Sequence, residues 1–337
     1  MKKNKVYFIG AGPGKPDLIT VRGLNILKEA DVVIYDYLVD KRVLGYAREE
    51  AELICCDKLA KKGRYYDGFL IHQQRINNLI VKKAKEGKKV VRLKNGDVSI
   101  FSRLSQELDA LVRNRIDFEL VPGVTAATAA ASYAGIPLTD RRFASTCTFV
   151  TGHEDPKKKI SSIDWEALSK IGTVVFYMAV ENLSEIVKEL IEAGKSKDTA
   201  CAIVRTATLA TQKVLSGKLE NIAEKAKQER IKPPAIIIVG DVVKSGKRFN
   251  WLKKNKKILF TGLSNERFFI KDTYFHLPLI KIEPMDDYRE FDNYIKNIKD
   301  YDWIIFASRY CTEYFFKRLG VIGLDLRVLT GIRIAAV

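Results

Sequence analysis

The feature that most constrains the fold of this chain is a short apolar run that ends in a glycine-rich loop. Residues 6–9 read Val-Tyr-Phe-Ile, and residues 10–14 read Gly-Ala-Gly-Pro-Gly. Such a run predicts a buried strand that turns sharply toward a helix. In an open α/β sheet, ligands bind at this end of the strands. The loop therefore indicates an α/β fold with a candidate binding loop at its first turn.

This loop matches the GxGxxG dinucleotide fingerprint only in part. The fingerprint needs a third glycine where Lys15 stands, and Pro13 occupies the turn that should lead into the helix. Taken alone, the loop is more typical of a tight turn that binds no ligand. Its meaning depends on the segments that follow it.

Those segments alternate between helical spacing and short apolar runs. A helix expected over residues 20–30 and a strand over 31–35 complete a βαβ unit, which implies a parallel sheet. Asp36 follows that strand, so it should lie at the same sheet edge as the glycine loop. Further strands are expected at residues 51–56, 89–93, 117–121, 146–151, 173–178, 200–204 and 235–239, with helices at 69–86, 103–113, 165–170, 182–193 and 219–230.

Two more turns follow predicted strands and could share that edge. Asn95-Gly96-Asp97 is a weak signal, because such triplets end many strands. Pro122-Gly123 is interpreted as the hinge into a second α/β domain, and Thr125 after it could be a helix N-cap or a ligand hydroxyl. Residues 126–135 carry small side chains, which suit close approach to a flat ligand or ordinary helix packing.

Composition narrows the class of protein. The 337 residues, 47% of them hydrophobic, are enough for at least two domains. Five cysteines without a repeated spacing predict neither a disulfide framework nor a metal site. Because no apolar segment approaches the roughly twenty residues of a membrane span, we expect a cytoplasmic protein without a membrane partner.

The net charge of +17 is open to two interpretations. One is a polyanionic partner, such as a small molecule with many carboxylates, and the other is a lysine-rich solvated surface. Since no motif interleaves aromatic and basic residues, a nucleic-acid partner is not expected.

The composition changes after Asp241. Residues 244–257 are strongly basic and predict a linker, and a new α/β pattern begins at Ile258. The sequence stops at residues 334–337, in what reads as the middle of a strand, so we expect a fragment of a longer chain.

Seven motifs in order over the first 240 residues or so closely resemble the uroporphyrinogen-III C-methyltransferases of the tetrapyrrole methylase family. They are GAGPGKPDLIT (10–20), YDYLV (35–39), RLKNGDVSIF (92–101), VPGVTAATAAASYAGIPLTDR (121–141), VTGHE (150–154), VVFYMA (174–179) and PPAIIIVGDVV (233–243). From Lys257 onward, the motifs ILFTG, HLPLIKIEP and DWIIFASRY are similar to the start of uroporphyrinogen-III synthase.

The resemblance implies a two-domain tetrapyrrole methylase fold that holds S-adenosyl-L-methionine between its domains, in a protein that is typically a homodimer. The implied organisation is a first α/β domain at residues 1–121, a second at 122–243, a basic linker at 244–256 and an incomplete synthase-like segment at 257–337. Because the synthase family builds two domains between which the chain crosses twice, we expect no independent synthase activity.

The resemblance also implies an activity and its residues. The activity is C-methylation of uroporphyrinogen III at C2 and C7 to give precorrin-2, for siroheme and cobalamin synthesis, with S-adenosyl-L-homocysteine as by-product. Asp36 corresponds to a carboxylate base and Lys58 to a proton donor. The implied cofactor contacts are Pro13, Asn95, Gly96, Asp97, Ile100, Thr125, Ala126, Met178 and Ala207.

Three departures from the family pattern qualify this prediction. Lys15 replaces an acid, Val98 ends a segment that is commonly GGDP, and residues 102–107 read SRLSQE in place of GRGGEE. Leu104 and Ser105 thus replace glycines in a loop that could need positive φ. The alternatives are a methylase of a later corrinoid precursor and a weakly active tetrapyrrole-binding protein.

Overall fold

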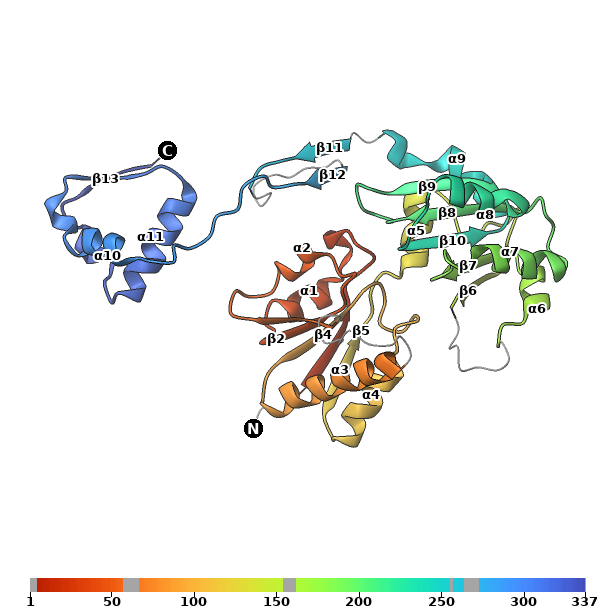
Figure 1. The fold of residues 1–337 in the computed structure, drawn as a ribbon, viewed down its shortest axis with the longest axis horizontal. Coiled ribbons are helices and arrows are strands. Elements are labelled where there is room, and N and C mark those ends of the chain that lie inside the picture. The colour runs from red at the N-terminus through yellow and green to blue at the C-terminus, as the bar shows by residue number, and fades with distance from the viewer. Residues whose placement is uncertain (1–4, 57–66, 154–161, 255–256, 264–272, 337) are drawn as a thin grey trace. The chain divides into compact units, whose positions relative to one another are not determined.

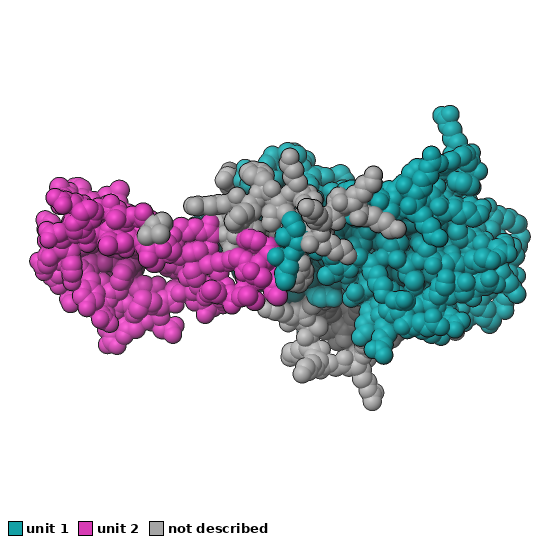
Figure 2. All heavy atoms as spheres, turned by 90° about the horizontal axis from the view of Figure 1, so that it is seen from above, with its two compact units in different colours: residues 1–259, 270–275 teal, residues 260–269, 276–337 magenta. Residues whose placement is uncertain are grey.

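The computed structural model describes residues 5–56, 67–153, 162–254, 257–263 and 273–336 (Figure 1). The chain divides into two compact units, one of residues 1–259 and 270–275 and the other of residues 260–269 and 276–337 (Figure 2). Among the described helices, none combines the length and the apolar character that crossing a membrane requires.

The first sheet is parallel, as the βαβ pattern predicts. Its strands, in spatial order, are β3 (Glu52–Cys55), β2 (Val32–Tyr35), β4 (Val90–Lys94), β1 (Lys5–Gly10) and β5 (Asp117–Val121). The chain leaves β1 in one direction across the sheet, toward β2, and leaves β4 in the other, toward β5. The order therefore reverses between β1 and β4, which is where ligands bind in open α/β sheets.

Helices cover both faces of this sheet. Successive residues of β1 point to opposite faces of the sheet. Phe8 packs with α3 (Asp67–Lys85) and α4 (Leu104–Arg113), and Ile9 packs with α1 (Val21–Leu27) and α2 (Lys41–Leu44). Because both faces are buried, the strands read as continuous apolar runs.

The second sheet is mixed. Its strands, in spatial order, are β6 (Cys147–Thr151), β7 (Thr173–Tyr177), β10 (Ala235–Val239), β8 (Ala200–Arg205) and β9 (Lys213–Lys218), of which only β6 and β7 pair in parallel. One face packs against α5 (Ala126–Ala134), the helix of small residues. The other packs against α6 (Trp165–Lys170), α7 (Leu183–Glu192) and α8 (Leu219–Gln228).

The segment expected to be a basic linker is largely helical where it is described. It contains the end of η3 (Asp241–Ser245), then α9 (Gly246–Phe249) and η4 (Trp251–Lys254). The Trp251 indole N–H donates to the Ser132 carbonyl at 3.0 Å, and its ring meets the Tyr133 ring edge-on at 5.3 Å. This hydrogen bond and ring contact hold the segment on α5 despite its charge.

The second compact unit has its own small core. A parallel pair of strands, β13 (Trp303–Phe306) and β14 (Arg333–Ala336), packs with α10 (Arg289–Lys296), α11 (Arg309–Val321), η5 (Ile298–Asp300) and η6 (Leu326–Leu329). A separate two-stranded sheet pairs β11 (Lys257–Phe260) with β12 (Thr273–His276).

Candidate active site

Two glycine turns meet where the strand order of the first sheet reverses. The Gly12 N–H donates to the Gly96 carbonyl at 3.2 Å, and the Gly96 N–H donates to the Gly12 carbonyl at 2.8 Å. Both residues are left-handed, with φ of +80° and +72°, which glycine adopts without steric cost. The two turns that sequence reasoning placed at one edge therefore form a reciprocal backbone bridge.

The turn after β5 joins this pair by direct backbone contact. A Cβ added at Gly123 would lie 2.3 Å from the Gly96 carbonyl oxygen and 2.7 Å from the Gly10 Cα. No side chain fits in that space, so glycine is required for the approach itself. Three loops of the first sheet thus lie backbone to backbone.

Asp97 fastens two of these loops together. One carboxylate oxygen accepts the Gly123 N–H at 2.8 Å, and the other accepts the Ser99 N–H at 2.8 Å and the Ser99 hydroxyl. Burial alone would raise the pKa of Asp97, but these hydrogen bonds outweigh burial and lower it. The carboxylate that sequence reasoning directed at the cofactor is thus also a structural link of the site.

The second sheet connects to the same loops through Tyr177, the last residue of β7. Its hydroxyl lies 2.6 Å from the Thr125 hydroxyl and accepts the Ala127 N–H at 3.1 Å. Thr125 is the N-cap of α5, yet its own side chain makes no capping bond. The tyrosine hydroxyl therefore satisfies a free N–H of the first helical turn, a task that N-cap side chains usually perform.

Met178 follows Tyr177 directly and has an unusual backbone. Its φ is +52°, and its apolar side chain is 54% exposed. Left-handed conformations of non-glycine residues cost energy and gather at functional sites. Phe101, also left-handed at φ +48° and 43% exposed, contacts the Tyr177 ring at 5.0 Å.

A fifth loop, residues 206–212, reaches the first glycine turn. The Lys15 N–H donates to the buried Thr208 hydroxyl at 3.0 Å, and the Thr208 N–H in turn donates to the Gln212 side chain at 2.8 Å. Ala207 lies in this loop, between two left-handed threonines.

Most residues that the family resemblance assigns to the cofactor therefore lie in loops that are joined to one another by hydrogen bonds or backbone contacts. Ile100 instead packs beside the core between α5 and the second sheet. The members of the joined loops are Pro13, Asn95, Gly96, Asp97, Thr125, Ala126, Met178 and Ala207.

The candidate base lies at the same edge of the first sheet. Asp36 follows β2, its side chain is 32% exposed, and it accepts an N–H of Arg92 at 2.5 Å. Lys58, the candidate proton donor, lies outside the described residues.

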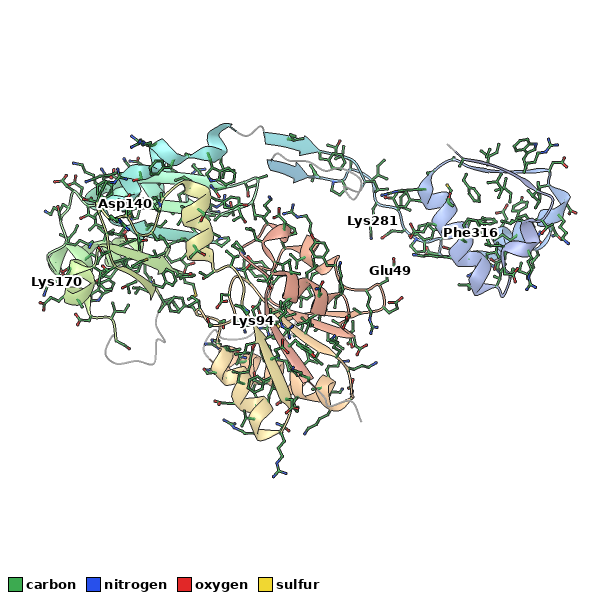
Figure 3. All side chains as sticks on the ribbon, turned by 180° about the vertical axis from the view of Figure 1, so that it is seen from behind. Glu49, Lys94, Asp140, Lys170, Lys281 and Phe316 are labelled. Carbon is green, nitrogen blue, oxygen red and sulfur yellow. The ribbon has the colours of Figure 1, made fainter. Side chains whose placement is uncertain are left out.

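Behind Asp36 is a buried charge cluster that sequence reasoning missed, formed by Arg92, Lys94 and Glu107. Glu107 is 1% exposed and accepts from Arg92 at 3.0 Å and from Lys94 at 2.8 Å. Figure 3 labels Lys94, the last residue of β4. The signal in the sequence is two cations at alternate positions of an apolar strand, which places both on one face.

The departures from the family pattern have local explanations. Leu104 and Ser105 occupy the first turn of α4, and the positive φ values fall instead on Phe101 and Arg103, at +48° and +58°. The Lys15 ammonium pairs with the Asp17 carboxylate at 2.8 Å, which offsets the charge it introduces.

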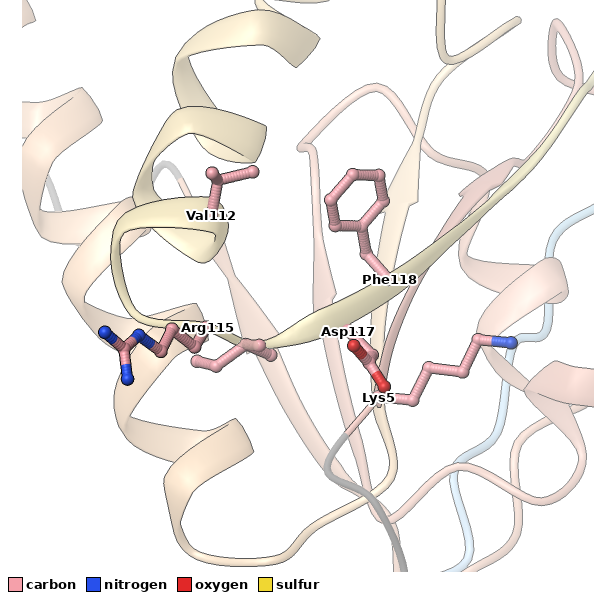
Figure 4. A pocket seen from close by; sticks show the side chains of 6 residues that line it. Lys5, Val112, Arg115, Asp117 and Phe118 are labelled. Carbon is pink, nitrogen blue, oxygen red and sulfur yellow. The ribbon is translucent and has the colours of Figure 1, made fainter.

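A shallow depression of about 710 Å³ opens at the opposite edge of the first sheet (Figure 4). Lys5 and Asp117, the first residues of β1 and β5, line it. It lies at the amino ends of the strands, away from the joined loops, and is not the candidate site.

Comparisons with known proteins identify two families along the chain. Residues 5–223 match the family of Tetrapyrrole (Corrin/Porphyrin) Methylases, and residues 273–337 match Uroporphyrinogen-III synthase HemD. The uroporphyrinogen-III C-methyltransferase of Bacillus subtilis is 37% identical over 342 residues, covering 98% of this chain and 69% of the relative. The enzyme of the same name from Methanocaldococcus jannaschii is 47% identical over 242 residues, covering 71% of this chain and 96% of the relative.

Solved structures show the same fold for the first unit. Uroporphyrin-III C-methyl transferase from Thermus thermophilus complexed with S-adenyl homocysteine has a TM-score of 0.60 at 34% identity, covering 71% of this chain and 99% of that one. The cobalt precorrin-4 methyltransferase CbiF has a TM-score of 0.62 at 30% identity, covering 71% of this chain and 96% of that one. With the family matched over residues 5–223 and a relative 47% identical, the chain belongs to the tetrapyrrole methylase family and is a methyltransferase.

Proposed function

We propose that this chain transfers methyl groups from S-adenosyl-L-methionine to uroporphyrinogen III, at C2 and C7, to give precorrin-2. The relatives from Bacillus subtilis and Methanocaldococcus jannaschii are named for this substrate, and one structural neighbour was crystallised with S-adenyl homocysteine. The observation that carries the proposal is the set of joined glycine loops where the strand order reverses, because it presents bare backbone at the place where α/β sheets bind ligands.

The site has groups that suit this cofactor. Half-buried Asn95 and Thr125, beside the bridged turns, offer polar side chains for its polar groups, and exposed Met178 offers an apolar, polarisable surface. We assign its binding to Pro13, Asn95, Gly96, Asp97, Ile100, Thr125, Ala126, Met178 and Ala207. When bound, the cofactor supplies an electrophilic methyl group on a sulfonium, whose departure needs no general acid.

The chain's own residues then have two tasks. The joined loops position the reactants and exclude water, which supplies much of the rate in a displacement between two bound molecules. Asp36 accepts the proton that the macrocycle must lose after methyl transfer, and Lys58 donates a proton to the macrocycle. Basic side chains near the site pair with the acetate and propionate arms of the substrate.

We further propose that the two five-stranded sheets are the two methylase domains, divided at residues 121 and 122. On the basis of the family resemblance, we propose a homodimer that acts in the cytoplasm. Residues 257–337 are proposed to have no independent synthase activity, because their matched part is only the 65 residues from 273 to 337.

The test is an anaerobic incubation of the purified chain with S-adenosyl-L-methionine and uroporphyrinogen III, followed by mass spectrometry. The expected product carries two additional methyl groups, and carbon-13 labelling of the donated methyls locates them at C2 and C7. Asp36→Asn should lower turnover without weakening cofactor binding. Binding of both compounds without S-adenosyl-L-homocysteine would instead indicate a tetrapyrrole-binding protein.

A second candidate substrate is a later corrinoid precursor. The similarity to cobalt precorrin-4 methyltransferase, with a TM-score of 0.62, favours this alternative. Parallel incubations with uroporphyrinogen III and with cobalt precorrin-4 separate the two, because preferential methylation of the latter would overturn our assignment of substrate.

A further inference from the structure

Together with Asp36, the buried charge cluster behind it contains equal numbers of cations and carboxylates. Arg92 and Lys94 are cations on one face of β4, and Glu107 reaches them from α4. Asp36 is the fourth member and the only partly exposed one, since the other three are each 2% exposed or less. The cluster is thus electrically neutral only when Asp36 carries its charge.

Arg92 is the centre of this cluster. Its Nε donates to Glu107 at 3.0 Å and one terminal nitrogen donates to Asp36 at 2.5 Å. The other terminal nitrogen faces the carbonyl oxygens of Ile34 and Leu93, at 3.4 Å and 3.3 Å. Every nitrogen of the guanidinium therefore has a fixed acceptor, and the group cannot turn without losing several of them.

We propose that Arg92 is a positioning residue for methyl transfer: fixed from behind by Glu107, it holds the Asp36 carboxylate in one orientation, aimed outward at the edge of the first sheet. This inference rests on the proposed role of Asp36 as the base. Lys94 completes the assembly by holding the second oxygen of Glu107 at 2.8 Å. Arg92 contacts no reactant in this scheme and acts only through Asp36.

The charges around Arg92 favour this assignment. Burial disfavours the guanidinium charge, but the Asp36 and Glu107 carboxylates outweigh burial and raise the pKa of Arg92. Burial and the neighbouring guanidinium lower the pKa of Lys94, so Arg92 is the permanent cation of the pair. The planar guanidinium can bridge two carboxylates at once, whereas an ammonium is a single point charge.

The titratable and charged groups that face Asp36 come from three elements. They are Arg92 and Lys94 on β4, Glu107 on α4, and Cys56 after β3. Burial raises the pKa of the Cys56 thiol to about 12, so it stays neutral in the range where a carboxylate titrates. Arg92 is therefore the cation that touches Asp36 among the described residues.

The test is the rate of single-turnover methyl transfer by Arg92→Lys in the full chain. Lysine keeps the charge but loses the bridging geometry. We expect the rate to fall about tenfold to a hundredfold, as for a misplaced catalytic group. Cofactor affinity, measured by titration calorimetry, should stay within about twofold, because Arg92 contacts none of the joined loops that we assign to the cofactor.

A matched control is Arg48→Lys. Arg48 pairs with Asp31 and donates to the Ala30 carbonyl at 3.0 Å, at the opposite end of β2 from Asp36. It should leave the rate unchanged. A loss of rate as large in Arg48→Lys as in Arg92→Lys would overturn the inference, since the effect would then come from the fold and not from Asp36.

The double variant decides how Arg92 acts. If it acts through Asp36, Arg92→Lys combined with Asp36→Asn should be no slower than Asp36→Asn alone. Additive losses, or an unchanged rate in Arg92→Lys, would refute the positioning role while leaving Asp36 as the base. An unaffected rate in Asp36→Asn would instead refute the proposed base, and the inference with it. Should Arg92→Lys fail to fold, Glu107→Asp takes its place in the comparison with Asp36→Asn. This substitution keeps the negative charge but shortens the side chain that holds Arg92, so the same outcomes support or refute the inference.

Discussion

Replacing Tyr177 by phenylalanine removes one oxygen from the middle of the site and leaves the ring. The ring remains packed edge-on against Phe101 and Phe149, at 5.0 Å and 5.9 Å. What is lost is the contact with the Thr125 hydroxyl and the acceptor for the Ala127 N–H. The first of these joins β7 to the turn after β5, and the second caps α5.

The size of the effect follows from these two bonds. Loss of a helix cap costs about 1 kcal/mol, and loss of a hydrogen bond between two hydroxyls costs about another 1 kcal/mol. A decrease of about 2 kcal/mol in the free energy of unfolding should lower the melting temperature of a unit this size by about 5 °C. Because Thr125 and Ala126 are assigned to the cofactor, we also expect its dissociation constant to rise about threefold to tenfold, which is about 1 kcal/mol.

The assays are differential scanning calorimetry and titration calorimetry with S-adenosyl-L-homocysteine. Tyr133→Phe is the matched control: Tyr133 lies on the same helix, and its half-buried ring packs on Trp251. Its hydroxyl makes no hydrogen bond among those found for the described residues, so we expect little change in either measurement. Equal effects of Tyr177→Phe and Tyr133→Phe on both measurements would show that the tyrosine hydroxyl does not hold the site together.

Three further predictions follow from the described contacts. Gly123→Ala should abolish cofactor binding, because its Cβ would lie 2.3 Å from a backbone oxygen of the neighbouring loop. Gly320→Ala should leave cofactor binding intact, because its Cβ meets nothing within 4 Å; titration calorimetry checks both variants. Leu104→Gly and Ser105→Gly, which restore family glycines, should each lower the melting temperature without raising turnover, because both sites are helical and glycine costs about 1 kcal/mol there. Burial raises the pKa of Cys201 from 9.0 to about 12, so above pH 9 the thiol ionises only in the unfolded chain. The free energy of unfolding of the wild type, measured by urea titration, should therefore fall between pH 9 and 12 more steeply than that of Cys201→Ala. The difference in slope should be up to about 1.4 kcal/mol per pH unit.

The central strands of the two five-stranded sheets were predictable because they are buried on both sides. Runs such as residues 174–177 and 235–239 consist of aliphatic and aromatic residues and end at turns. β9 was not predicted, because it pairs with β8 alone at the edge of its sheet and mixes lysines, serine and glycine with two apolar residues. The helical structure of residues 246–254 was also missed, since local charge suggested a linker while the contacts of Trp251 with α5 come from distant sequence.

The site shows the same division between local and distant information. The position of Asp36 followed from the end of a strand, which is local. Its partner Arg92 is 56 residues away, and the Tyr177 hydroxyl meets Thr125 across 52 residues. Spacing along the chain carries no signal for such pairs, although a cation within an apolar strand does indicate that a buried anion must face it.

The first glycine loop can now be understood through its neighbours. Gly10 lies against the backbone of Gly123, Gly12 bridges to Gly96, and Gly14, at φ +151°, faces Thr208 and Leu209. Each glycine thus serves a different loop, and none is needed to cradle a phosphate at a helix N-terminus. A dinucleotide loop must lead straight into a helix, whereas here Pro13 and Lys15 continue into a 3-10 turn, η1 (Pro16–Leu18), before α1 begins. The departure from GxGxxG is therefore what a loop requires when its partners are other loops and the proposed ligand carries no phosphate.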